Sequence, residues 1–547
     1  MQTMSTNFSK KKIEKEVQRR RTFAIISHPD AGKTTLTEKL LLYGGAIHLA
    51  GSVKGRRAAK HAVSDWMELE KQRGISITSS VLQFPYGDFA INLLDTPGHA
   101  DFSEDTYRTL AAADSAVMLM DVAKGVEPQT IKLFKVCAMR KLPIFTFVNK
   151  MDRWGRPPLE LMEEIEDILG IRSTPINWPI GMGSEFKGVY DRINEEIVVF
   201  DSAGRHGESI LDETRVALND PSAEKLLGTD RYLQLLEDIE LLDIAGDPFD
   251  LERVRNGELT PMFFGSAMTN FGVRPFLDHF VDMAPSPADS ADPTIEPTSE
   301  DFSGFVFKIQ ANMNPAHRDR LAFMRITSGV FQKDMQAKIL RSDRDIKLAY
   351  PQQFLASERE VANEAYAGDI IGLYDPGRFR IGDTIYTGTP VEETEIPRFS
   401  PEHFAVVEIK DVLKRKQLTK GLQQLSEEGT IQVFHQPQLG TMDAIVGAVG
   451  LLQFEVLTFR LEHEYGVKAA LRRLSFEHAR WVDGEIDEDA LNRAEYVKVL
   501  RDRDDLPMVL FRNNWALNYV SQQYPDVKFL PNPPGTPGLQ QLHGRSF

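Results

Sequence analysis

Cysteine is almost absent from this chain, since Cys137 is the only one among its 547 residues. A single cysteine excludes an internal disulfide framework and fits a reducing compartment. The chain also lacks any apolar run near the roughly 20 residues that a membrane helix needs. Residues 1–21 are polar and basic, without the apolar centre of a signal peptide. These absences predict a protein of the cytoplasm that does not span a membrane.

An excess of positive charge is absent too, because 80 acidic residues outnumber 64 basic ones and give a formal net charge of −16. This balance argues against charge-driven binding of nucleic acid, including DNA, by the whole surface. Two local basic segments remain, at residues 10–21 and 414–420. Each is either a contact for RNA or the solvated face of a helix. The length predicts about three to four domains.

The first functional motif joins a predicted strand to a predicted helix. The apolar stretch from Phe23 to Ser27 is followed by HPDAGKTT and then by a helical pattern. This is the order of a phosphate loop, whose backbone N–H groups and helix N-terminus surround phosphates. Gly32 lets the backbone approach, Lys33 would reach the β- and γ-phosphates, and Thr34 would bind Mg²⁺. Ser27 stands where the motif usually has glycine, and a chance strand–turn–helix joint is the alternative.

Three further strand ends carry residues that fit a guanine nucleotide. The segment FAINLLDTPGH contains Asp95, which can hold Mg²⁺ through water, and Gly98, whose N–H can sense a γ-phosphate. LPIFTFVNKMD ends in Asp152, whose two oxygens can accept from the ring N–H and the amine of guanine. TPMFFGSAM brings Ser266 and Ala267 toward the oxygen of the base. Because ligands of parallel sheets bind at the carboxyl ends of strands, four such motifs in sequence outweigh chance.

The predicted site therefore draws on four segments of the chain. The predicted GTP-binding residues are Ser27, His28, Pro29, Asp30, Ala31, Gly32, Lys33, Thr34, Asp95, Thr96, Pro97, Gly98, Asn149, Lys150, Met151, Asp152, Ser266 and Ala267.

Together these motifs resemble those of translational GTPases, and the run Arg73-Gly74-Ile75-Ser76-Ile77 resembles the end of their first switch. The resemblance implies a P-loop GTPase that binds GTP or GDP with Mg²⁺ and has switches near residues 55–77 and 98–107. Its implied metal ligands are Thr34, Ser76 and Asp95, although Thr78 is a second candidate for the switch hydroxyl. It also implies that His99 is catalytic and orients the attacking water once the ribosome holds it in place.

The remaining chain predicts an α/β protein of several domains. We expect a basic N-terminal segment (1–20), a P-loop GTPase domain (21–284) with an inserted subdomain (about 158–258), and a linker (285–301). Short strands with glycine turns then predict a β-barrel domain (302–396). The order βαββαβ predicts a split ferredoxin-like α/β domain (397–529). The Pro/Gly-rich end, 530–547, predicts a disordered tail.

The barrel and C-terminal sequences are particular enough to narrow the resemblance. GFVFKIQANM, KQLTKGLQQLSEEG and VGAVGLLQFEV resemble the class II release factors of bacteria. This implies a ribosome-dependent GTPase that promotes dissociation of class I release factors from the ribosome after peptide release. The alternatives are a translocase-like or ribosome-rescue GTPase, and a GTP-sensing scaffold that binds the ribosome without turnover. The short C-terminal region argues against a translocase, and His99 argues against a scaffold.

Overall fold

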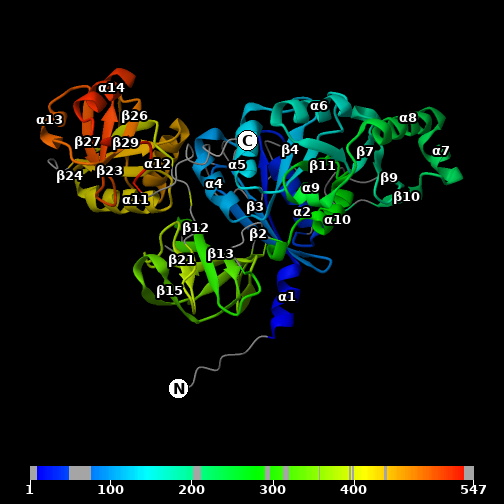
Figure 1. Cartoon of the computed structure of the whole chain (residues 1–547), viewed down its shortest axis with the longest axis horizontal. Helices are drawn as coiled ribbons and strands as arrows, with labels where there is room; N and C mark the ends of the chain where they lie inside the picture. Colours follow the sequence, from blue (N-terminus) through cyan, green and yellow to red (C-terminus); the bar gives the residue numbers. More distant parts are fainter. Residues whose placement is uncertain are drawn as a thin grey trace.

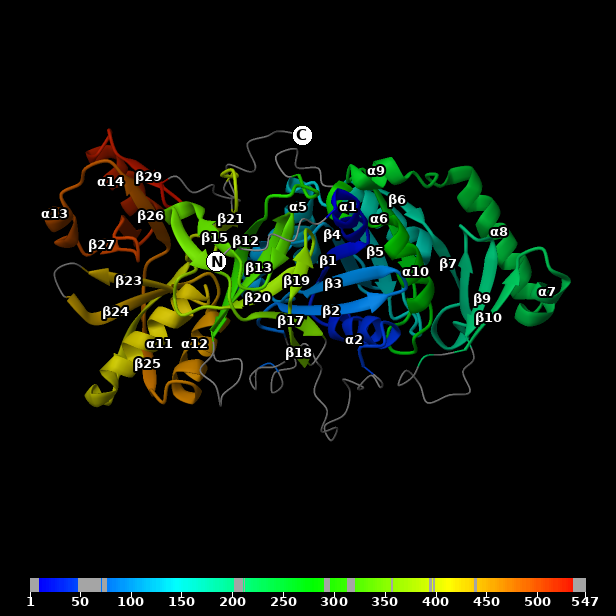
Figure 2. The same cartoon turned by 90° about the horizontal axis from the view of Figure 1, so that it is seen from below.

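The structure is a computed structural model, and it describes residues 9–47, 70, 76–200, 210, 212–289, 296–311, 320–355, 358–392, 396, 399–436 and 440–534. Three bodies follow one another along the chain (Figure 1). An α/β body in blue, cyan and green carries the N-terminal half, a strand-rich body in light green and yellow lies beside it, and an α/β body in yellow to red follows. Figure 2, seen from below, shows the strand-rich body in front of the junction between the other two, which lie side by side in Figure 1.

The first body is built on a parallel sheet, as the strand-end argument requires. Its order is β2-β3-β1-β4-β5-β11-β6, and only β2 runs antiparallel to its neighbour in this body. On its other side β2 pairs with β17 (Pro351–Leu355) of the second body, where Leu355 lies opposite Gln83. The strands are β1 (Arg20–Ser27), β2 (Ser80–Tyr86), β3 (Phe89–Asp95), β4 (Ser115–Asp121), β5 (Ile144–Asn149), β6 (Arg172–Pro175) and β11 (Leu259–Phe264). The helices around it are α2 (Lys33–Tyr43), η1 (Ala100–Phe102), α4 (Ser103–Ala111), α5 (Pro128–Met139), α6 (Pro158–Leu169) and α10 (Val273–Met283).

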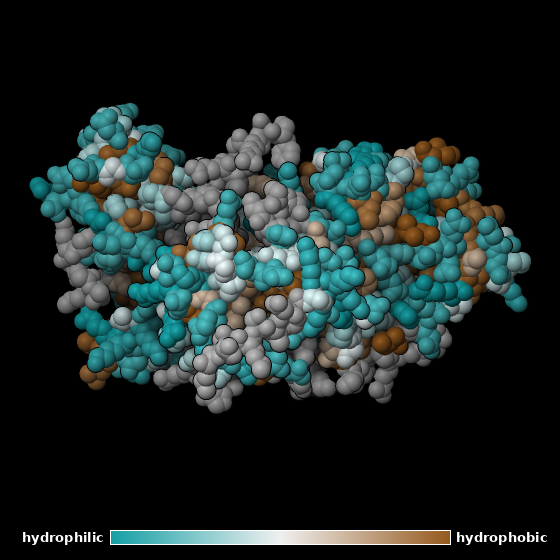
Figure 3. All heavy atoms as spheres, turned by 60° about the horizontal axis from the view of Figure 1, so that its bottom comes forward, coloured by the Kyte–Doolittle hydropathy of each residue, from teal (hydrophilic) through white to brown (hydrophobic). Residues whose placement is uncertain are grey.

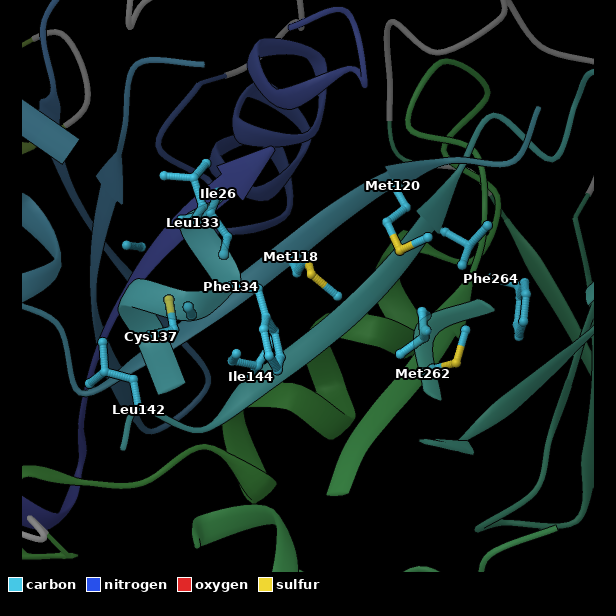
Figure 4. Close-up of a cluster of buried hydrophobic side chains, with 14 of the residues drawn as sticks. Ile26, Met118, Met120, Leu133, Phe134, Cys137, Leu142, Ile144, Met262 and Phe264 are labelled. Carbon is cyan, nitrogen blue, oxygen red and sulfur yellow. The ribbon is translucent and has the colours of Figure 1, made fainter. Parts of the chain in front are cut away.

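Both faces of this sheet are buried, which explains why its strands are apolar throughout. Alternate residues of a strand point to opposite faces. Thus Phe23 and Ile25 join the core cluster that contains α2 and α10, whereas Ala24 and Ile26 join the cluster that contains α4, α5 and α6. Figure 4 shows part of the second cluster, where Cys137 lies among Ile26, Met118, Phe134 and Ile144. Burial raises the pKa of the Cys137 thiol to about 12, so it remains protonated inside this core.

An additional antiparallel sheet lies between β6 and β11 in the sequence. It consists of β7 (Asn177–Ile180), β8 (Gly188–Asp191), β9 (Glu196–Phe200) and β10 (Glu213–Ala217), in the order β10-β9-β8-β7. The helices α7 (Pro221–Leu227), α8 (Thr229–Ala245) and α9 (Leu251–Arg255) follow. β8 and β9 form a hairpin, in which Asp191 pairs with Glu196 and Glu195 has a positive φ of 54°.

The second body contains antiparallel strands around one apolar core. Its main sheet has the order β16-β15-β21-β12-β13-β20-β17, and β14 pairs with β19. The strands are β12 (Ser303–Ala311), β13 (Arg320–Ser328), β14 (Val330–Gln332), β15 (Gln336–Ile339), β16 (Arg344–Lys347), β17 (Pro351–Leu355), β18 (Glu358–Val361), β19 (Glu364–Tyr366), β20 (Ile370–Tyr374) and β21 (Thr384–Tyr386). The expected strand-rich domain is therefore present.

The third body holds two βαββαβ units where the sequence predicted one. The first has β22 (His403–Ile409), α11 (Arg415–Glu427), β23 (Gln432–Gln436), β24 (Gly440–Ala448), α12 (Leu451–His463) and β25 (Ala469–Leu474). The second has β26 (His478–Asp483), α13 (Glu488–Asn492), β27 (Val497–Arg501), β28 (Pro507–Phe511), α14 (Asn514–Gln523) and β29 (Lys528–Leu530). They share one sheet, β25-β22-β24-β23-β27-β28-β26-β29, joined where His435 pairs with Arg501.

The N-terminal helix α1 (Lys10–Gln18) connects the first two bodies. Ile13 and Val17 are buried against Val330, Tyr366 and Ala367 of the strand-rich body, while the basic residues on the other side of the helix face solvent. The lysines of the basic segment thus lie on the solvated face of a packed helix, whereas Arg20 and Arg21 belong to β1 and are buried. Most of the predicted tail, residues 535–547, lies outside the described residues, as do residues 290–295 of the predicted linker.

The surface and the helices agree with the absence of apolar runs in the sequence. The face in Figure 3 is mainly hydrophilic and carries small, separate hydrophobic patches. Within the described part of the chain, no helix has the length and apolar character needed to cross a membrane.

Candidate nucleotide site and its switch

The phosphate loop lies between β1, which ends at Ser27, and α2, which begins at Lys33. Its backbone needs two residues in the left-handed region, Asp30 at φ 68° and Gly32 at φ 102°. A Cβ on Gly32 would also lie 2.3 Å from the Asn149 side-chain nitrogen. Glycine is therefore required here both by conformation and by the close approach of β5.

The predicted phosphate and metal residues meet behind this loop. Lys33 Nζ donates to Asp95 Oδ1 at 2.5 Å and to Ser76 Oγ at 3.2 Å, and all three side chains are buried. Thr34 follows Lys33 in the first turn of α2. Hydroxyl and carboxylate oxygens are ligands that Mg²⁺ prefers, so Thr34, Ser76 and Asp95 fit this ion chemically.

The first switch is described only in part. Residues 48–69 and 71–75, which include Arg73, Gly74 and Ile75, lie outside the described residues. Ser76 lies against Lys33. The Glu70 carboxylate instead accepts from the backbone N–H groups of Ile77 and Thr78 at 2.9 and 3.1 Å. The arrangement therefore favours Ser76 over Thr78 as the switch hydroxyl.

The predicted base-binding segment is fixed by hydrogen bonds to the phosphate loop. Asn149 donates to the Ala31 carbonyl at 2.8 Å and accepts from the Ala267 N–H at 2.9 Å. Asp152 Oδ1 accepts from the Ser266 hydroxyl at 2.6 Å. These contacts bring three of the four motifs to one edge of the sheet, as predicted. Met151 is buried in the core, and its N–H donates to the Gly265 carbonyl at 3.1 Å.

Sequence reasoning missed the anchor of Lys150. Lys150 Nζ donates to the Asp30 carbonyl at 2.5 Å and to Asp121 Oδ2 at 2.7 Å. Burial by itself would raise the pKa of Asp121, but hydrogen bonds from Lys150 and the Ala123 N–H outweigh it and lower that pKa. The available signal was an acidic residue at the end of the apolar run SAVMLMD, which is β4.

The second switch begins where β3 ends. The Thr96 hydroxyl donates to the Ile25 carbonyl at 2.7 Å, which fixes the strand end beside β1. Gly98 lies close to the phosphate loop, because a Cβ built on it would be 3.5 Å from the Pro29 nitrogen. Within the phosphate loop, the His28 ring is directed to Glu127, and its Nδ1 lies 3.0 Å from Oε2. The first part of this switch therefore contacts the loop that would hold the phosphates.

His99 caps the short helix η1 with its side chain. Its Nδ1 lies 3.2 Å from the Asp101 N–H and 3.3 Å from Asp101 Oδ1. The ring stands edge-on to Phe102 with centroids 6.2 Å apart, and the side chain is 36% exposed. Because Nδ1 is engaged by Asp101, Nε2 is the nitrogen that remains for another partner.

The helix α4 after His99 contacts both of the other bodies. Lys308 of β12 donates to the Ser79 carbonyl, and Asp105 accepts from the Ser79 N–H at 2.7 Å. Burial by itself would raise the pKa of Asp105, but the charges of Lys308 and Arg108 and the hydrogen bonds from Ser79 lower it. Burial lowers the pKa of Lys308. The guanidinium of Arg108 lies against Gly429, at the end of α11.

Three family models match successive parts of the chain. Residues 18–286 match the elongation factor Tu GTP binding domain, residues 301–388 match domain 2 of elongation factor G, and residues 394–521 match the C-terminal domain of the class II release factor RF3. A solved structure from Thermus thermophilus shares the fold, with a TM-score of 0.68 and 22% identity over 85% of this chain and 70% of that one.

The fold, the four nucleotide motifs and the first two matches define a translational GTPase. Peptide chain release factor 3 of Symbiobacterium thermophilum is 59% identical over 94% of this chain and 98% of its own length. The same factor from a Cyanothece species is 55% identical over 96% and 98% of the two chains. The chain belongs to the peptide chain release factor 3 family, and it is a GTPase of translation termination.

Proposed function

We propose that this GTPase binds the ribosome in the cytoplasm after peptide release and promotes dissociation of the class I release factor. The observation that carries the proposal is the contact between the second switch and both C-terminal bodies. Lys308 donates to the Ser79 carbonyl, and the Ser79 N–H in turn donates to Asp105 of the second switch at 2.7 Å. The Leu452 N–H of α12 donates to Asp101 Oδ2 at 2.7 Å. A change in the switch therefore has a direct route to the parts of the chain farthest from the nucleotide.

The proposed cycle is a shift between two ribosome conformations. A ligand moves such an equilibrium only as far as it binds the two states with different affinity. GTP with Mg²⁺ would order the switches around residues 55–77 and 98–107, and the ordered factor would prefer the conformation that binds the class I factor weakly. Hydrolysis, with His99 orienting water, would then remove this preference and release the GTPase itself.

Each group of site residues has a proposed role in this cycle. The loop from Ser27 to Thr34 holds phosphates, and Lys33 neutralises the β- and γ-phosphates. Thr34, Ser76 and Asp95 hold Mg²⁺, which supplies charge neutralisation at the phosphates when bound. Asp152, supported by Ser266, reads guanine. We propose the same domain division as the sequence indicates, with the GTPase domain at 21–284, the β-barrel domain at 302–396 and the α/β domain at 397–529.

The test measures class I factor dissociation directly. Post-release ribosomes carrying a fluorescent class I factor are mixed with the chain and GTP, a non-hydrolysable GTP analogue, or GDP. We expect GTP and the analogue to accelerate the first round of dissociation, whereas GDP does not. The Lys33→Ala variant serves as the matched control that lacks the phosphate contact. Equal dissociation rates with and without the chain would exclude the proposal, and movement of tRNA instead would indicate a translocase.

A further inference from the structure

Asp101 lies between the second switch and the C-terminal domain and contacts both. On one side its N–H and Oδ1 lie 3.2 and 3.3 Å from His99 Nδ1. On the other side its Oδ2 accepts from the Leu452 N–H at 2.7 Å, across 351 positions of sequence. Its backbone N–H thus binds the proposed catalytic histidine, and its carboxylate binds the first turn of α12, a helix of 13 residues.

The contact with α12 is closely fitted. Gly450 is the residue before α12, and a Cβ on it would lie 2.2 Å from Asp101 Cγ. Its backbone is extended, with φ −134° and ψ 159°, so the backbone conformation does not require glycine. Glycine is required instead because Asp101 occupies the space that a Cβ would fill. Beside it, Ile77 and Phe102 form a small buried cluster with Val456 of α12.

We infer that Asp101 is a positioning residue for His99 and that the N-terminus of α12 sets where Asp101 lies. The Asp101 N–H donates to Nδ1, which therefore carries no proton, so that the Nε2–H of the ring is left to point away from η1. A hydrogen bond that occupies one ring nitrogen in this way sets the tautomer and the nitrogen that acts on water. A change in the position of the C-terminal domain would therefore change the orientation of the His99 ring. The inference rests on the role proposed for His99.

This link is distinct from binding of the nucleotide. Asp101 follows the Asp95–His99 motif, and it forms hydrogen bonds with His99 and with the first turn of α12. Gly450 belongs to another domain. A displacement of Asp101 should therefore alter the rate of hydrolysis and leave the affinity for GTP unchanged. A shift of about 1 Å in a positioning group can change a rate by about a hundredfold.

The test adds one methyl group on the far side of the contact. Gly450→Ala introduces a Cβ against Asp101, and Gly447→Ala is the matched control. A Cβ on Gly447 would meet Phe434 at 2.8 Å and Pro401 at 2.9 Å, both within the C-terminal domain. We expect Gly450→Ala to lower the single-turnover rate of ribosome-stimulated hydrolysis by about tenfold to a hundredfold, with unchanged GTP affinity. Gly447→Ala should hydrolyse GTP at the wild-type rate.

Two double variants test whether the added methyl acts through Asp101 and His99. The added methyl should have no further effect in the His99→Ala background if it acts through the histidine. It should also lose its effect in the Asp101→Gly background, because both the Cγ and the Cβ that it meets are gone. Equal rates for wild type and Gly450→Ala, or equal losses in the two glycine variants, would overturn the inference. If His99→Ala itself hydrolyses normally, the role proposed for His99 fails first, so the two failures are distinguishable.

A second pair of variants applies if Gly450→Ala does not fold, as judged by its thermal unfolding midpoint. Asp101→Asn retains an oxygen that accepts from the Leu452 N–H, whereas Asp101→Ala does not. We expect hydrolysis in Asp101→Asn to lie between wild type and Asp101→Ala, at constant GTP affinity. Full activity in Asp101→Ala would overturn the inference without reference to Gly450.

Discussion

The nucleotide site and the contact surface of the second switch are built in different ways. The nucleotide site uses four short motifs at strand ends of one sheet, joined by contacts such as that between Asn149 and Ala31. The switch contact surface consists of η1, α4 and Ser79 together with Lys308 and Leu452, which contact them from the other two bodies. Neither Lys308 nor Leu452 belongs to a nucleotide motif. The residues that recognise the nucleotide stand in short motifs that can be found in the sequence. The residues that couple the domains are brought together only by the tertiary fold.

His99 is the residue on which the two regions meet, and it should show the largest effect. His99→Ala removes the group that orients water, while the phosphate loop and Asp152 are unchanged. We expect ribosome-stimulated hydrolysis to fall by about 10²- to 10³-fold, as when one preorganised polar group is removed from an active site. GTP affinity and single-round dissociation of the class I factor should persist. Single-turnover hydrolysis and the residence of the chain on the ribosome measure this.

Normal multiple-turnover hydrolysis in His99→Ala would remove the histidine from the mechanism. Loss of single-round dissociation while GTP remains bound would mean that cleavage, and not the ordered switch, drives the release step. Either result would show that the nucleotide site and the switch contact surface are less independent than their separate sets of residues indicate.

Asp152 tests the nucleotide site alone. Asp152→Asn exchanges an acceptor for a donor, which loses the amine of guanine and suits the C2 oxygen of xanthine. Hydrogen bonds to a charged group contribute about 1.5–3 kcal/mol each. We therefore expect GTP affinity to fall by at least about tenfold and XTP affinity to rise, measured by equilibrium binding of both nucleotides. Continued preference for GTP would show that Asp152 does not read the base.

Lys308 tests the switch contact surface alone. Lys308→Met keeps the length of the side chain but removes the donor to the Ser79 carbonyl and the buried charge near Asp105. An unsatisfied buried group costs about 1–3 kcal/mol. We expect a loss of that size in the free energy of unfolding, measured with denaturant, and no change in GTP affinity. A variant of wild-type stability with weakened GTP binding would contradict the separation of the regions.

The hydrogen-bonded pair of Asp191 and His279 lies outside both regions. We expect its loss to have the smallest effect, and it serves as a reference. Asp191 accepts from His279 Nε2 at 2.7 Å and joins the inserted sheet to α10. Burial by itself would raise the pKa of Asp191, but the hydrogen bond and charge of His279 lower it. A lowered carboxyl pKa stabilises the fold above the unfolded value of about 3.9, and this stabilisation is lost as pH falls through the folded value.

We therefore expect Asp191→Asn to lower the thermal unfolding midpoint at pH 6 and to approach wild type in acid, below pH of about 3.9. Nucleotide affinity at pH 7 should be unchanged. A difference between the two proteins that grows on acidification would show that the pKa of Asp191 is raised and not lowered.

The sequence by itself determined the chemistry of the nucleotide site. Apolar strands followed by HPDAGKTT, DTPGH and NKMD encode strand ends whose polar residues must converge, because parallel strands share one carboxyl edge. Lys33, Asp95, Asn149 and Ser266 do converge in the structure. The first βαββαβ unit was also readable, since α11 and α12 are 13 residues long with apolar residues at helical spacing.

Only the tertiary structure decided the rest. The second βαββαβ unit was missed because α13 has five residues and its short pattern carries little helical signal. Asp121, Lys308 and Asp101 gained their partners from folding, across 29, 229 and 351 positions of sequence. Periodicity and motifs report interactions between residues a few positions apart. A lysine in a strand or an aspartate after a histidine acquires its role only when distant elements pack against it, and that packing is set by the fold as a whole.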